Sequence, residues 1–111
     1  MKNLLKEISE NISGIWGNKK YELILGLNNT FTFEDRTSGE IIDGTYSIIE
    51  HSETHYPTLR LSELTGTQHD YVINELTVFE SLNISHAGNK IQLKNIPPDE
   101  YDGEIINPSN N

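Results

Sequence analysis

Residues 21–34 read Tyr21-Glu22-Leu23-Ile24-Leu25-Gly26-Leu27-Asn28-Asn29-Thr30-Phe31-Thr32-Phe33-Glu34, and this stretch decides the fold. Large apolar side chains occupy alternate positions on both sides of Asn28-Asn29. Such alternation is typical of a strand with one buried face, and an Asn pair between two alternating runs is a turn signal. The stretch therefore predicts a β-hairpin.

The same two-residue period continues along the chain. A turn at residues 35–39 leads into residues 40–49, where Gly44 lies in mid-strand and indicates a bend or a close approach of another backbone. After a polar connection at residues 50–57, alternating runs recur around residues 59–64, 71–76, 82–84 and 91–93. Short strands with short links predict an antiparallel meander, and the pattern leaves a closed barrel and a two-sheet sandwich both open.

The two ends of the chain differ from this middle part. Residues 1–12 place Leu4, Leu5, Ile8 and Ile12 at helical spacing, which predicts a short amphipathic helix packed on the rest of the domain. The barrel or sandwich is expected over residues 13–96, and residues 97–111 form an acidic, polar C-terminal tail. Within that tail, residues 104–106 are a candidate for one more edge strand.

Length and charge limit the possible partners. The chain has 111 residues, 17 acidic against 8 basic side chains and no cysteine, giving a formal net charge of −9. One hydrophobic core fits this length. The negative charge opposes binding to phosphate backbones and to anionic membranes, so we expect neither nucleic acid nor a membrane as partner. Because the sequence has no apolar run typical of a signal peptide and no cysteine, we expect a cytoplasmic protein.

A short motif precedes the hairpin. Together with the later strand-like segments, it forms a series with a fixed order along the chain. The segments are Gly14-Ile15-Trp16-Gly17, Asn29-Thr30-Phe31-Thr32-Phe33, Asp43-Gly44-Thr45-Tyr46-Ser47-Ile48, Leu59-Arg60-Leu61, Tyr71-Val72-Ile73-Asn74-Glu75-Leu76-Thr77 and Leu82-Asn83-Ile84. Over residues 13–95 this series resembles small bacterial lipocalin-like domains of the calycin type. The resemblance implies an all-β fold, an antiparallel up-and-down barrel of about seven to eight strands with a short N-terminal α-helix.

The resemblance also implies roles for single residues. Trp16 would close one end of the barrel under a basic side chain, for which Lys94 is the candidate in place of the Arg usual in the family. A small apolar ligand would lie inside, with Tyr46 or Tyr71 as a polar handle. Eight strands enclose a space that side chains can fill or that can hold one small ligand, and the sequence leaves both open. The candidate ligand-binding residues are Leu25, Phe31, Phe33, Tyr46, Ile48, Leu61, Tyr71 and Ile73.

A second hypothesis places the function on the surface. Val78 and Phe79 lie where the alternation predicts a turn, and two large apolar side chains at a hairpin tip either cover the barrel end or contact a partner. An acidic surface around such a patch would suit a basic protein partner. The protein would then be an interaction module of the immunity type, which neutralises a basic partner such as a toxin.

Residues that could carry chemistry are few. His51, His55 and His69, with Glu50 and Glu53, are the only candidate metal cluster, and because His51 and His55 fall in a predicted loop their spacing sets no ligand geometry. We therefore expect no metal site. No serine lies in a Gly-x-Ser-x-Gly turn and no Gly-rich phosphate loop is present, so neither an enzyme nor a cofactor is expected.

Overall fold

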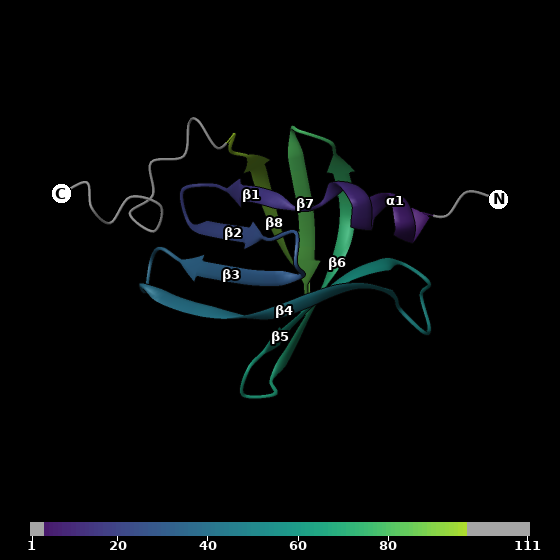
Figure 1. Cartoon of the computed structure of the whole chain (residues 1–111), viewed down its shortest axis with the longest axis horizontal. Helices are drawn as coiled ribbons and strands as arrows, with labels where there is room; N and C mark the ends of the chain where they lie inside the picture. Colours follow the sequence, from purple (N-terminus) through teal and green to yellow (C-terminus); the bar gives the residue numbers. More distant parts are fainter. Residues whose placement is uncertain (1–3, 98–111) are drawn as a thin grey trace.

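The computed structural model describes residues 4–97, and in this part the chain forms one helix and eight strands. The elements are α1 (Leu4–Asn11), β1 (Gly14–Gly17), β2 (Tyr21–Leu25), β3 (Thr30–Asp35), β4 (Glu40–Glu50), β5 (Pro57–Glu63), β6 (Gln68–Thr77), β7 (Ser81–His86) and β8 (Asn89–Asn95). Each strand pairs antiparallel with the next, and β8 returns to pair with β1 (Figure 1). The sheet is therefore a closed up-and-down barrel, which confirms the predicted fold class and rules out the sandwich.

The motif that precedes the predicted hairpin forms the short first strand. Gly14–Gly17 is a strand of its own, separated from β2 by a turn in which the Asn18 Oδ1 atom accepts hydrogen bonds from the backbone N–H groups of Lys20 and Tyr21, both at 2.7 Å. An asparagine side chain that bonds the backbone two residues on is a common turn former. This short strand completes the eight, whereas the additional strand considered at residues 104–106 lies outside the described residues.

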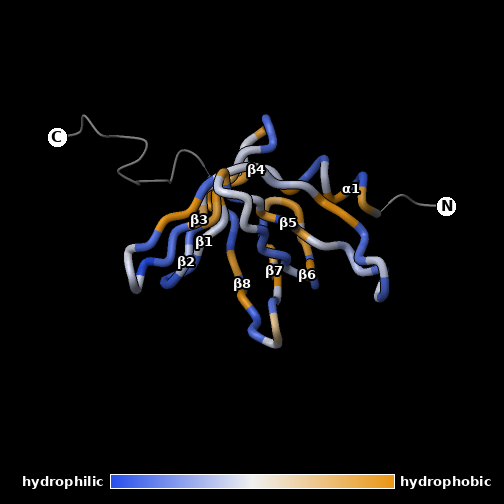
Figure 2. The backbone as a smooth tube through the Cα atoms, turned by 90° about the horizontal axis from the view of Figure 1, so that it is seen from below, coloured by the Kyte–Doolittle hydropathy of each residue, from blue (hydrophilic) through white to orange (hydrophobic). Residues whose placement is uncertain are grey.

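The core is built from the alternating positions that the sequence predicts. Leu23, Leu25, Phe31 and Phe33 face the interior and are buried, as are their counterparts on the other strands. In Figure 2 hydrophobic residues mark stretches of the strands and α1, while most connections between strands are hydrophilic. Burial of one face of every strand is the main force that holds such a barrel together.

Helix α1 covers one end of the barrel, which we call the closed end. Ile8 and Ile12 are buried in the core, and the Trp16 indole Nε1–H donates to the carbonyl of Ile12 at 2.7 Å. This confirms the predicted packing of the amphipathic helix. The opposite end, which we call the mouth, carries the β1–β2, β3–β4, β5–β6 and β7–β8 connections (Figure 1).

Gly44 lies where β4 comes closest to β5. A Cβ atom built at Gly44 would stand 2.0 Å from the Ser62 carbonyl oxygen. Since any other residue carries a Cβ, the two backbones can approach in this way only at glycine. The close approach that the sequence predicts at Gly44 is confirmed.

Candidate functional site

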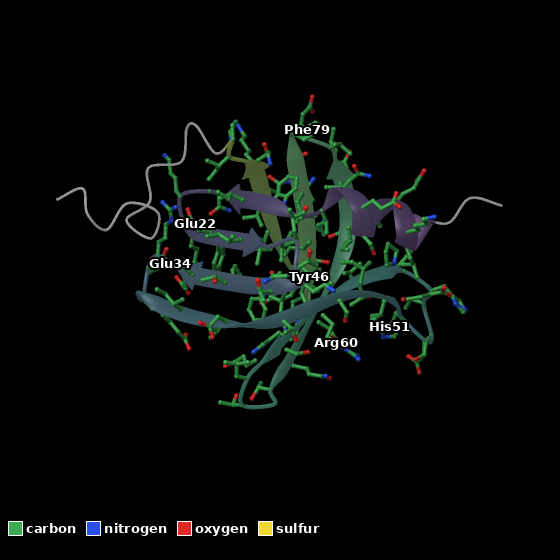
Figure 3. The ribbon with its side chains drawn as sticks, in the orientation of Figure 1. Glu22, Glu34, Tyr46, His51, Arg60 and Phe79 are labelled. Atoms are coloured by element: carbon green, nitrogen blue, oxygen red, sulfur yellow. The ribbon has the colours of Figure 1, made fainter. Side chains whose placement is uncertain are left out.

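The middle of the barrel is filled with side chains. Of the candidate ligand-binding residues, Leu25, Phe31 and Leu61 are at most 2% exposed and belong to the core. Tyr46 is also buried (Figure 3). Its hydroxyl donates a hydrogen bond to the Gly26 carbonyl at 3.1 Å, and burial raises the pKa of this hydroxyl. These side chains pack against one another, so a long ligand has no path along the barrel axis.

A small open cavity of about 270 Å³ lies at the mouth. Its apolar wall is made by Tyr21, Phe33, Ile42 and Tyr71. The Phe33 ring stands 5.5 Å from the Tyr21 ring and 6.0 Å, nearly edge-on, from the Tyr71 ring. Tilted and edge-to-face contacts of this kind hold aromatic rings in a fixed arrangement. Two predicted ligand residues, Phe33 and Tyr71, therefore meet here.

Polar side chains surround this aromatic wall. Asp35, Glu40, Glu63 and His69 also line the cavity, and the Glu63 carboxylate lies 2.6 Å from the His69 Nε2 atom. Burial, with a smaller contribution from Tyr21, raises the pKa of the Tyr71 hydroxyl, which therefore stays a neutral donor at neutral pH. The mouth thus combines aromatic faces with hydrogen-bonding groups, as small-molecule sites do.

Another hollow, of about 490 Å³, lies on the outside of the closed end between α1 and β6. Ile8, Ile73, Leu76 and Val78 contribute apolar surface to it, and Glu7 and Glu75 contribute carboxylates. Ile73, a predicted ligand residue, lies here and not at the mouth. Ile48 lies in neither hollow and packs, partly buried, against the core.

The tip of the β6–β7 hairpin exposes the pair Val78 and Phe79. Figure 3 labels Phe79 at this tip. Phe79 is 83% exposed and its backbone φ is +64°. A left-handed φ is unfavourable for a bulky residue, and glycine or asparagine is the usual occupant. The turn at residues 77–81 is confirmed, and Phe79 does not cover the barrel end.

The predicted contact between Trp16 and Lys94 is absent from the described structure. Trp16 is buried at the closed end, but Asn95, not Lys94, is its partner on β8. Because Leu93 takes the inward position, the strand alternation turns Lys94 outward, where it is exposed opposite Gly17.

The three histidines of the candidate metal cluster lie apart. His69 is at the mouth, whereas His51 and His55 are in the β4–β5 connection at the closed end. There His55 Nδ1 lies 2.5 Å from Glu50 Oε2, and His51 Nδ1 accepts the backbone N–H of Glu53 at 3.1 Å. Among residues 4–97 no three His, Asp or Glu side chains are grouped so that they could hold a metal ion.

No protein-family model matches the chain, and neither do curated proteins or solved structures. Over residues 4–97, no helix has the length and apolar character needed to cross a membrane.

Sequence reasoning missed the polar half of the mouth. Asp35 was assigned to a turn, Glu40 to a strand start and His69 to a loop cluster. The signal in the sequence was their spacing from inward-facing residues. Asp35 follows Phe33 by two residues, and Glu40 precedes Ile42 by two. Residues two apart on a strand share a face, so these side chains continue the inward rows into the mouth.

Proposed function

We propose that the protein is a non-enzymatic binding module that takes a small, mainly apolar ligand at the mouth of its barrel. The observation that carries this proposal is the cavity of about 270 Å³ lined by Tyr21, Phe33, Ile42 and Tyr71. A concave apolar surface with a few polar groups around it is the usual form of a ligand site. The lipocalin-like assignment, with its bacterial and cytoplasmic setting, forms part of the same proposal.

The size of the cavity limits the ligand. A volume of about 270 Å³ corresponds to roughly nine water molecules at about 30 Å³ each. Packing of Leu25, Phe31 and Leu61 stops a ligand from entering further. The proposal therefore favours a compact molecule of about ten non-hydrogen atoms over a fatty acid, sterol or haem.

A titration with 2-phenylethanol, followed by amide NMR spectra of the full chain, tests the proposal. Saturable shifts are expected at Ile42, Glu63 and Tyr71. Tyr71→Leu is expected to weaken binding about two- to tenfold, because one aromatic contact contributes about 0.5–1.5 kcal/mol. Tyr56→Leu is the matched control, since Tyr56 is exposed at the closed end and should leave binding unchanged. Shifts confined to α1, or no saturable shifts, would overturn the proposal.

A second candidate function is contact with a basic protein through Val78 and Phe79. The observation that favours it is the strained, exposed position of Phe79, because unfavourable backbone angles concentrate at functional sites. Pull-downs with the wild type and a Val78→Asp/Phe79→Asp variant test it, with Leu64→Asp as control because Leu64 is exposed in the β5–β6 connection. A basic partner lost only from the double variant is expected, and identical partner sets would remove this candidate.

A further inference from the structure

We propose that the mouth selects a cationic ligand, namely an organic amine whose apolar body lies on the aromatic rings and whose ammonium group meets carboxylates. This inference rests on the proposed function, because it assigns a ligand class to the same cavity. The carboxylates of Asp35, Glu40 and Glu63 carry it, together with the rings of Tyr21 and Tyr71.

The strand register directs these carboxylates into the mouth. Asp35 pairs with Tyr21 on β2 and with Glu40 on β4. Paired residues on neighbouring strands point to the same face, so both carboxylates share the face of the Tyr21 ring. Glu63 shares a face with the buried Leu61, two residues before it. Three acidic side chains thus stand on β3, β4 and β5 around one cavity.

Two of the three carboxylates already have partners in the chain, and one remains available. Asp35 Oδ1 accepts the backbone N–H of Thr37 at 2.9 Å, and Glu63 lies 2.6 Å from His69. Within residues 4–97 the Glu40 carboxylate has no such partner, although it stands directly opposite Asp35. Like charges opposite each other on a sheet destabilise it, and a bound cation relieves this repulsion.

The aromatic wall suits the same ligand. The Lys20 Nζ atom lies 5.3 Å from the centre of the Tyr21 ring, so this wall already holds an ammonium group of the chain. Aromatic faces attract cations through their quadrupole. Three groups that can carry positive charge lie beside the aromatic wall. His69 lines the cavity and contacts Glu63, Lys20 lies at the Tyr21 ring, and the His86 ring lies 5.5 Å from the Tyr71 ring.

A metal ion is a poorer fit than an amine. Metal ions of the Ca²⁺ class need about six to eight oxygen ligands at about 2.3–2.6 Å. In the described part of the chain no three acidic or histidine side chains come close enough together for that. An ammonium group needs only one or two carboxylates and gains from the rings beside them.

The test compares three ligands of one shape on the full chain at 0.15 M salt and pH 7.5: 2-phenylethylamine, 2-phenylethanol and phenylacetate. Mouth amide shifts in NMR titrations give each affinity. The amine is expected to bind about tenfold more tightly than the alcohol, equivalent to about 1.4 kcal/mol, and the acid more weakly than both. The salt screens charges more than about 8 Å away, so the comparison reports groups near the ligand.

Matched variants separate local recognition from overall charge. Glu40→Gln/Glu63→Gln removes two charges at the mouth, and Glu53→Gln/Glu80→Gln removes two exposed charges at the closed end. The first variant is expected to reduce the preference for the amine to about threefold or less, while alcohol binding and the second variant stay as in the wild type.

The failures of the two proposals are distinguishable. If amine and alcohol bind at the mouth equally well, or if both double variants reduce the amine preference alike, the inference of a cationic ligand is wrong and the binding proposal stands. If none of the three ligands shifts the mouth amides, the binding proposal itself fails.

Discussion

Replacing Gly44 by alanine tests the close approach of β4 to β5. The new Cβ would stand 2.0 Å from the Ser62 carbonyl oxygen and 3.0 Å from the Glu63 Cα. A carbon–oxygen contact is ordinarily about 3.3 Å, so the two strands would have to separate by roughly 1.3 Å at this point. Backbone atoms are the obstacle here, and they cannot turn aside as a flexible side chain can.

The cost follows from that separation. Overpacking typically costs about 1–3 kcal/mol, and the loss of two ladder hydrogen bonds adds about 1 kcal/mol each. We expect Gly44→Ala to lower the free energy of unfolding by about 3–5 kcal/mol. Urea unfolding followed by circular dichroism measures it: with an m-value of about 2 kcal/mol/M, the midpoint should fall by about 2 M.

Gly39→Ala is the matched control. Gly39 has a φ of +81°, but a Cβ there meets nothing within 4 Å, so only the backbone angle opposes alanine. The expected cost is about 1–2 kcal/mol, or a midpoint shift of about 0.5–1 M. Equal shifts for Gly44→Ala and Gly39→Ala would refute the argument, because the contact with Ser62 would then contribute nothing.

Three further substitutions have defined outcomes. Arg36→Gln should lower the free energy of unfolding by about 1–3 kcal/mol in urea unfolding, because Arg36 donates at 2.9 Å to the Glu22 carboxylate, which is only 5% exposed; an unchanged midpoint would contradict this. Hydrogen bonds from Arg60 hold the pKa of Asp70 below its ordinary value, so this pair stabilises the fold above about pH 3.9 and loses its effect as the pH falls through the lower folded-state pKa. Arg60→Gln should therefore lower the Tm at pH 7 but not at pH 2. The loss in the free energy of unfolding at pH 7 should be less than about 1 kcal/mol because the pair is partly exposed, and an equal loss at both pH values would contradict the argument. Phe79→Asn should raise the stability by about 0.5–1 kcal/mol, since asparagine tolerates the left-handed φ, and a lower Tm would show that Phe79 packs in the fold.

Alternation along the chain was enough to predict the barrel core. Leu25, Phe31 and Leu61, which the sequence predicts to face inward, are all buried. This succeeds because the side-chain period of a strand is two, so that one correctly placed residue fixes the face of the rest. Gly44 was found for a similar reason, because a glycine within an alternating run has few explanations other than a bend or a close contact.

The alternation did not predict what depends on where strands end and how they pair. The sequence does not show that Asn18 turns the chain after Gly17, so the alternation alone does not separate β1 from β2. It does not give the β1–β8 register either, and one residue of register decides whether Lys94 or Asn95 lies opposite Trp16. Asp35 falls in a predicted turn, and the apolar alternation gives no reason to expect the charged side chains of Glu40 and Glu63 on the inward face of their strands.

The pairing of β1 with β8, the seam that closes the barrel, is expected to form last during folding. Two register pairs, Trp16 with Asn95 and Gly17 with Lys94, and a backbone hydrogen bond from Ile96 to Ile15 join this seam, whereas all other pairings in the barrel are between strands consecutive in sequence. Local hairpins form fast, and contacts between distant residues form late. We therefore expect the chain to pass through an open sheet with two unpaired edges, which a second copy could join by exchanging strands. A net charge of −9 makes two such sheets repel each other, so we expect the acidity of the chain to oppose this exchange until the first and last strands meet.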